Sequence, residues 1–360
     1  MDPNILRDPY KEFLEAEKLP VTEDFSVDLF EVDLAPWSRL GCRAGIVHLG
    51  ASEYVSLAVQ EFAPGSSSEP MRHLYEEVVY VLSGRGSTTI TDPDGGRHSF
   101  EWGPQALFAI PLNAEFQHHN LSGTAPARLV STVSLPLAMN TFRDPEFVYG
   151  IDYNFRDRFS EARYMQGEGR HLSEIDYHRN IWETNFVPDL TTFGELRPLE
   201  SRGAGGSNIG FALANGTIHA HVSEIPIRRY KRAHRHGPDF HVFPIDGPGY
   251  SLMWFEGDED FRRVNWRHGV VLAPQDQMFH QHFNTGAKPI RYLATAFGSY
   301  RFPFSGPQRD MMTSSNKTIA DGGNMIRYED QDPRVHAMFS SELAQSRLTP
   351  DMDNYHPRVD

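Results

Sequence analysis

The residues in this 360-residue chain whose types and spacing could do chemistry are histidines, of which there are 17. His234 and His236 stand two positions apart, and His280 and His282 repeat that spacing further along. In a β-strand, residues i and i+2 project from the same face, so each pair is expected to point to one side. Two imidazoles from one strand and one from a neighbouring strand would bind a divalent metal and leave coordination positions open.

The remaining members of the predicted site are less constrained by spacing. His280 or His282 could be the third ligand, and His241 could be a fourth ligand or a catalytic base beside the metal. His282 is then a second candidate catalytic residue. Two other interpretations stay open: four histidines could enclose a purely structural metal, or the histidines could lie apart on the surface.

A short basic run precedes the histidines and could bind an anionic substrate. Arg229 and Arg232 are the candidates, because a guanidinium binds a carboxylate through two parallel hydrogen bonds. The same arginines could instead lie on a solvated strand edge or at a subunit contact. Trp254 and Gln281 are further candidates to line the substrate site.

The elements that must position these residues come from an internal repeat. When His73 is laid on His236, an offset of 163 residues, residues of several types match without a gap. The matching pairs are Gly84 with Gly247, Pro111 with Pro274, His119 with His282, Arg128 with Arg291, and Thr132 with Thr295. The chain is therefore interpreted as a tandem duplication of a unit spanning 54–135 and again 219–297.

Each unit has the pattern of short β-strands. Runs rich in β-branched and aromatic residues, such as Glu77–Leu82, alternate with breaks rich in glycine and proline. Many short strands at this spacing predict a sandwich or jelly roll. At the same offset His234 falls on Met71 and His280 on Gln117, so the first copy is expected to hold no metal.

The two histidine segments resemble the two motifs of the cupin superfamily. The motif places are occupied by His234, His236, Gly247, Pro274, His280 and Asn284. The spacing to Asn284 favours His280 over His282 as the ligand. With the duplication, the resemblance implies an all-β bicupin: two tandem jelly-roll domains of the double-stranded β-helix type, with a short helical arm and tail.

One departure from the motif bears on the chemistry. The carboxylate ligand is absent, because Phe240 or His241 stands where glutamate is expected. Manganese bicupins of the oxalate-decarboxylase type depend on that glutamate. The chain therefore resembles more closely the cupins with an all-histidine ferrous site, such as gentisate- and salicylate-cleaving dioxygenases. The gentisate-type enzymes carry their metal in the N-terminal cupin, whereas here the C-terminal copy holds the histidines.

The resemblance implies an Fe(II)-dependent dioxygenase that uses dioxygen to cleave a C–C bond of a small hydroxylated aromatic acid or related oxygenated anion. Manganese, nickel and zinc are alternative metals, because imidazole binds them all. Two alternative functions remain: an oxygen-independent metal-dependent isomerase or lyase, and a non-enzymatic bicupin with a structural metal.

Composition and charge exclude several other classes. The net charge of −14 argues against a nucleic-acid-binding surface, and no apolar run is long enough for a membrane span. The single cysteine, Cys42, rules out a disulfide framework and a thiolate zinc site. The acidic N-terminus is unlike a secretory signal. We therefore expect a cytoplasmic protein, and one that forms a homo-oligomer.

The expected division of the chain has five parts: an arm at 1–53, a metal-free cupin domain at 54–144, a connector at 145–217, a metal-binding cupin domain at 218–300, and a tail at 301–360. A short acidic helix is expected within 1–20. A second helix is expected at Pro333–Arg347, with Asp332 as its N-cap.

Overall fold

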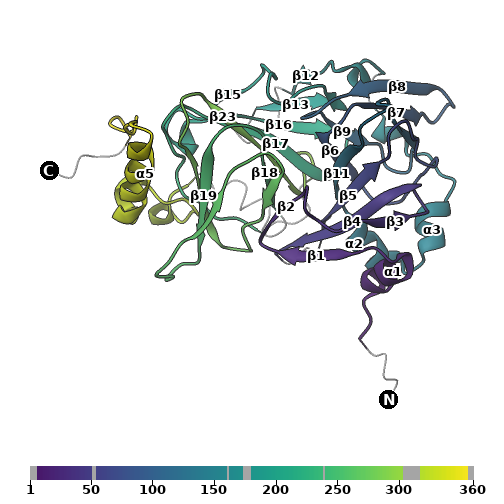
Figure 1. Cartoon of the computed structure of the whole chain (residues 1–360), viewed down its shortest axis with the longest axis horizontal. Helices are drawn as coiled ribbons and strands as arrows, with labels where there is room; N and C mark the ends of the chain where they lie inside the picture. Colours follow the sequence, from purple (N-terminus) through teal and green to yellow (C-terminus); the bar gives the residue numbers. More distant parts are fainter. Residues whose placement is uncertain are drawn as a thin grey trace.

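The computed structural model describes residues 6–50, 54–159, 162–172, 180–237, 240–302 and 317–355. Two β-barrels lie side by side, one built mainly from the first half of the chain and the other mainly from the second (Figure 1). Each barrel consists of one large sheet and one separate three-stranded sheet. This architecture confirms the predicted all-β fold and the tandem duplication.

The first barrel follows the strand order of a jelly roll. Its large sheet consists, in spatial order, of β1 (Val21–Asp24), β4 (Cys42–Leu49), β5 (Ser56–Phe62), β11 (Ala127–Val133), β6 (Glu77–Ser83), β9 (Leu107–Ile110) and β14 (Phe186–Val187), with β3 (Ala35–Trp37) paired to β4. Its small sheet consists of β10 (Glu115–Asn120), β7 (Gly86–Thr91) and β8 (Arg97–Trp102).

The second barrel repeats this arrangement. Its large sheet consists of β12 (Arg170–His171), β13 (Ile181–Thr184), β16 (Ser207–Leu213), β17 (Ile218–Ile225), β23 (Ile290–Phe297), β18 (His241–Pro244), β21 (Val270–Leu272) and β2 (Ser26–Asp28), with β15 (Arg197–Pro198) paired to β16. Its small sheet consists of β20 (Arg262–Asn265), β19 (Gly249–Trp254) and β22 (Phe279–Asn284).

Segments expected to be an arm and a connector supply strands to both barrels. β1, β3 and β4 lie within 1–53 and join the first barrel, whereas β2, from the same segment, pairs with β21 of the second. In return, β14 from the connector pairs with β9 of the first barrel. This exchange ties the two barrels together, so the arm and the connector are parts of the sheets.

The helices are short and lie outside the barrels. They are α1 (Pro9–Glu17), α2 (Leu135–Phe142), α3 (Pro145–Gly150) and α5 (Pro333–Gln345), with 3-10 turns η1 (Arg156–Arg158), η2 (Ala162–Gln166), η3 (Glu200–Arg202), η4 (Ile319–Asp321) and η5 (Tyr328–Asp330). Both predicted helices, α1 and α5, are present. The Asp332 carboxylate accepts a hydrogen bond from the Arg334 backbone N–H at 2.8 Å, as expected of an N-cap. Among the described helices, none has the length and apolar character needed to cross a membrane.

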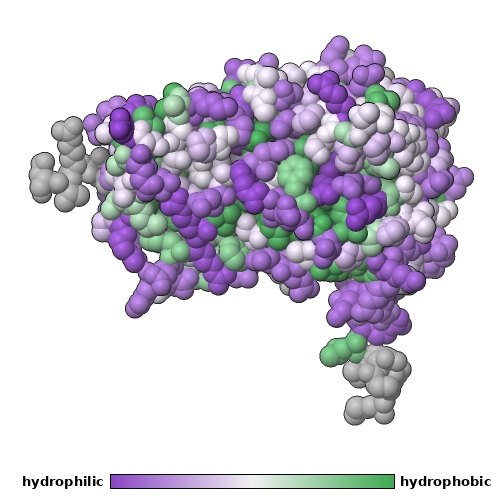
Figure 2. Space-filling view, in the orientation of Figure 1, coloured by the Kyte–Doolittle hydropathy of each residue, from purple (hydrophilic) through white to green (hydrophobic). Residues whose placement is uncertain are grey.

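The two large sheets pack face to face across a shared apolar core. Side chains such as Val59 of β5 and Val222 of β17 belong to it. At its centre the hydroxyls of Thr132 and Thr295, equivalent positions of the repeat, hydrogen-bond at 2.7 Å. The outer surface intersperses hydrophilic residues with smaller hydrophobic areas (Figure 2). Each barrel also encloses its own core.

The strand registers show which positions of the two barrels are equivalent. In the first barrel Gly86 pairs with Asn120, and in the second Gly249 pairs with Asn284. The offset is therefore 163 residues at β7 but 164 at β10, because one residue has been inserted between them. It follows that Phe116, rather than Gln117, occupies the place of His280.

Candidate metal centre

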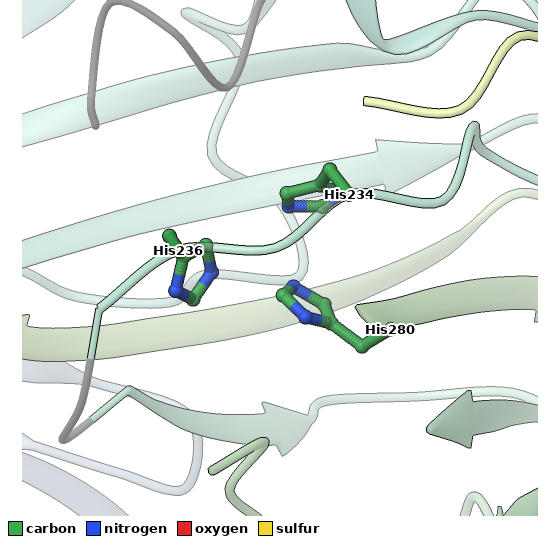
Figure 3. A group of neighbouring side chains, drawn as sticks. All are labelled: His234, His236 and His280. Atoms are coloured by element: carbon green, nitrogen blue, oxygen red, sulfur yellow. The ribbon is translucent and has the colours of Figure 1, made fainter. Parts of the chain in front are cut away.

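Three of the predicted ligands come together inside the second barrel. His234 and His236 lie on an extended segment between β17 and β18, and His280 lies in β22. The backbones of His234 and His280 pair, with N–O distances of 3.1 and 2.9 Å. One ring nitrogen from each of the three residues lies within 4.8 Å of the others, and the rings turn toward a common point (Figure 3). In the described part of the chain, it is the one group of three or more histidine, cysteine or acidic side chains close enough to bind a metal ion together.

The orientation of each ring suits metal binding through the same atom. In each case Nδ1 lies within hydrogen-bond distance of a backbone carbonyl: 3.4 Å for His234 to Arg232, 3.2 Å for His236 to Gly237, and 3.3 Å for His280 to Met278. A Nδ1–H that donates to a carbonyl holds the ring in place and directs Nε2 to the metal.

The electrostatics of the site keep the three rings neutral, which is the form that binds a metal. Burial lowers the pKa of His280 to about 3 and moves those of His234 and His236 well below their usual value. The positive charge of Arg202 adds to this effect on all three. Three convergent neutral imidazoles fit a divalent metal ion such as iron, manganese, nickel or zinc.

The first barrel has lost this arrangement. Met71, His73 and Phe116 occupy the three ligand positions, and Met71 pairs with Phe116 as His234 pairs with His280. The remaining His73 is hydrogen-bonded at both nitrogens: Nδ1 donates to the Tyr75 carbonyl at 2.8 Å, and Nε2 lies 3.0 Å from the Glu77 carboxylate. A buried, fully hydrogen-bonded histidine between a thioether and a phenyl ring has a structural role.

Residues 58–133, which form most of this first barrel, match a family model described as a cupin domain. The N-terminal barrel is a cupin domain. The C-terminal barrel repeats its strand order, so the chain has the two-domain architecture of a bicupin. A search of curated protein sequences found no match.

Solved structures resemble the chain at low sequence identity. One is oxalate decarboxylase from Bacillus subtilis at pH 4.6, with 16% identity, coverage of 78% of each chain and a TM-score of 0.48. A single-residue variant of the same enzyme gives the same identity, coverage and TM-score. A likeness of this degree concerns the fold and carries nothing about activity.

The place of the missing carboxylate in the C-terminal cupin domain is filled by a phenyl ring. In the N-terminal cupin domain Glu77 contacts His73, and its equivalent at the offset of 163 is Phe240. The Phe240 ring lies on that of His236, with centroids 3.9 Å apart. Of the two residues considered from the sequence, Phe240 therefore replaces the glutamate, and the ligand set carries no negative charge.

His241 lies outside the metal group, contrary to its prediction as a ligand or catalytic base. In β18 its neighbour Val242 packs inside the barrel, whereas Phe243 packs in the core between the barrels. Strand alternation turns His241 to the same side as Phe243. Its side chain is fully buried, and neither ring nitrogen has a hydrogen-bond partner.

His282, the other predicted catalytic residue, shares the inner face of β22 with His280. Its Nδ1 lies 2.8 Å from the hydroxyl of Ser251, which also accepts from the Trp266 indole at 2.8 Å. The N-terminal cupin domain repeats the motif with His118, Thr88 and Trp102. Because the motif occurs in the domain without the three-histidine group, it supports the barrel in both.

Gln281 and Trp254 lie on the outer faces of their strands. Gln281 alternates with the inward His280 and donates to the Lys231 carbonyl at 2.8 Å. Gln117 makes the equivalent bond to Ser68 in the N-terminal domain, which indicates a structural role. Trp254 pairs in register with Phe279 and stacks on it at 5.8 Å, away from the histidines.

The two candidate arginines contact the C-terminal tail. Arg229 forms an ion pair with Asp351 at 2.8 Å, and the Arg232 guanidinium lies 5.3 Å from the centre of the Tyr328 ring. The structure therefore does not bring either one to the histidines as a carboxylate-binding group. The packing of the tail on this segment, which a single sequence does not show, accounts for the difference.

Three residues near the site were not singled out from the sequence. Arg202, in η3 of the connector, is buried and acts electrostatically on the histidines. Lys231 and Tyr292 are buried inside the barrel, with the ammonium 3.2 Å from the hydroxyl. Only Lys231 carried any signal, because it stands within the basic run beside His234.

Proposed function

We propose that the C-terminal cupin domain is the active site of a non-haem Fe(II)-dependent dioxygenase that cleaves a C–C bond of a small hydroxylated aromatic acid or related oxygenated anion. The observation that carries the proposal is the neutral set of His234, His236 and His280, with Phe240 in the place of a carboxylate. Such a set leaves the charge of the metal uncompensated, which favours an anionic substrate that binds through adjacent oxygens.

The metal and the chain have separate tasks in this proposal. Ferrous iron would supply Lewis acidity and the capacity to react with dioxygen, and both oxygen atoms would enter the ring-opened product. His234, His236 and His280 would hold the ion through their imidazoles, and the Phe240 ring packs on that of His236, with centroids 3.9 Å apart. The positive charge of Arg202, which acts on the His234 ring, would favour an anion near the histidines.

An oxygen-independent isomerase or lyase is the second candidate. It is favoured by the buried Lys231–Tyr292 pair, which could transfer protons without dioxygen. A purely structural metal is favoured less. Such a site usually has four protein ligands, and His241 does not lie with the other three histidines.

The test is metal analysis followed by oxygen uptake. Protein purified anaerobically is expected to hold about one iron per chain, to lose it in His236→Ala and to keep it in His73→Ala, which changes the equivalent histidine of the N-terminal domain. The loaded protein should then consume oxygen with salicylate or gentisate. Turnover of a substrate without oxygen would support the isomerase or lyase, and metal kept in His236→Ala would refute the site.

A further inference from the structure

The interior of the C-terminal cupin domain contains a lysine and a tyrosine in direct contact. Lys231 and Tyr292 are 3% and 4% exposed, and the ammonium nitrogen lies 3.2 Å from the phenol oxygen. Tyr292 faces inward from β23 beside Ser223, its partner in register on β17. Burial alone would raise the pKa of Tyr292, but the charge of Lys231 and a hydrogen bond with Ser223 outweigh it and lower that pKa.

The N-terminal cupin domain shows that the fold does not need this pair. The backbone N–H of Ser68 donates to the His118 carbonyl, as that of Lys231 donates to the His282 carbonyl, so Ser68 is equivalent to Lys231. Leu129 pairs with Gln60 in the register in which Tyr292 pairs with Ser223. The N-terminal domain therefore folds with a serine and a leucine at the positions where the C-terminal domain has a lysine and a tyrosine.

The pair lies on the metal side of the barrel. The Tyr292 ring centre is 4.7 Å from that of His282, which is 5.4 Å from that of the predicted ligand His280. Removing an ammonium group from water is energetically costly. A buried lysine that the N-terminal domain lacks therefore points to a function specific to the C-terminal domain. An ammonium beside a hydroxyl is a site for an oxyanion, with one group supplying charge and the other a hydrogen bond.

We propose that Lys231 and Tyr292 anchor the carboxylate of the substrate inside the C-terminal cupin domain. The Lys231 ammonium supplies the positive charge and the Tyr292 hydroxyl donates a hydrogen bond to the same group. This assignment rests on the proposed function in taking the anion to be the ligand of the three-histidine site. It replaces Arg229 and Arg232 in the role expected of them from the sequence.

The test is a binding measurement that needs no turnover. Full-length protein loaded with Co(II) is titrated anaerobically with benzoate and with its neutral analogue benzamide, by calorimetry. Wild-type protein is expected to prefer benzoate by about tenfold or more, as a hydrogen-bonded charge pair allows. Lys231→Met should abolish that preference by weakening benzoate alone, Lys231→Arg should retain much of it, and Tyr292→Phe should reduce it.

The control is Lys288→Met, which removes an exposed lysine of the same domain and should leave the preference unchanged. Cobalt content and the unfolding temperature identify a variant that has failed to fold, in which case Lys231→Gln takes its place. Equal binding of the two probes by wild-type protein, no binding of benzoate, or an unchanged preference in the lysine variants overturns the assignment. Failure of oxygen uptake with intact binding refutes the dioxygenase and leaves the anchor standing.

Discussion

At the scale of single residues, strand alternation decides which histidines can do chemistry. His280 and His282 alternate inward on β22, while His241 on β18 turns into the core between the barrels. A buried imidazole without hydrogen bonds costs about 1–3 kcal/mol relative to one that is satisfied. His241 is therefore a weak point of the core rather than a member of the site.

This placement predicts that His241→Leu raises the free energy of unfolding, by about 1–2 kcal/mol, because the unsatisfied ring nitrogens are removed. Metal content should not change. Urea unfolding with metal analysis measures both. His118→Leu is the matched control: His118 is equally buried but bonds to Thr88 at 2.8 Å, so its loss should destabilise. Loss of metal in His241→Leu would restore His241 as a ligand.

A second prediction at this scale concerns Phe240, whose ring lies where a carboxylate ligand is expected. Phe240→Glu returns a carboxylate to the position that Glu77 holds beside His73. The added negative charge should strengthen Mn(II) binding by about tenfold or more and weaken benzoate binding, because the ion then keeps less charge for an anion. Phe240→Gln, similar in size but neutral, separates charge from shape. Equal effects of both variants would contradict the electrostatic explanation.

At the scale of elements, the C-terminal tail is part of the second domain. Residues of α5, including Phe339 and Leu343, pack with Tyr250 and Phe283 on the outer face of the small sheet. Nearer the site, the backbone of Ile326 bonds to that of Ala233, and Asn324 to Arg235, on either side of His234. The tail therefore supports the segment that carries two predicted ligands.

The N-cap of α5 provides a test of this support. Asp332→Ala removes the hydrogen bond to the Arg334 backbone and should lower the free energy of unfolding by about 1 kcal/mol. Asp332→Asn retains a capping oxygen and should lose less. Chemical unfolding monitored by circular dichroism distinguishes the two. Equal losses would show that the ion pair with Arg334, rather than the cap, stabilises the helix.

At the scale of the whole molecule, buried neutral histidines should make the protein sensitive to acid. Burial lowers the pKa of His118 to about 4 and that of His241 to about 3. The unfolded chain binds protons at these residues below about pH 6.5, whereas the folded protein does not. The free energy of unfolding is therefore highest above pH 6.5, where the histidines are neutral in both states, and it decreases as the pH falls toward the folded pKa values.

Each of these histidines should add a slope of up to about 1.4 kcal/mol per pH unit to the unfolding free energy in that range. Urea unfolding between pH 4.5 and 7.5 (roughly the window these pKa values define) measures the slope. The double variant His118→Leu with His241→Leu should reduce this slope, because two of the buried neutral histidines are removed. A slope that is unchanged in the double variant would show that other groups govern the acid response.

The sequence by itself determined the features that depend on local spacing. Paired histidines two residues apart, short β-branched runs between glycine and proline breaks, and a repeat at an offset of 163 predicted the all-β duplication and three converging ligands. These features follow from the two-residue period of a strand, which is a property of the backbone. The N-cap of α5 was also predictable from local sequence, because an aspartate just before the helix can accept a hydrogen bond from a backbone N–H of its first turn.

Only the tertiary structure decided which distant side chains meet. It placed Phe240 rather than His241 in the carboxylate position, turned Arg229 toward Asp351, and brought Lys231 to Tyr292. It also moved β2 into the sheet of the second barrel. The physical reason is that strand register and packing between sheets set these contacts, and both depend on residues far apart in the chain.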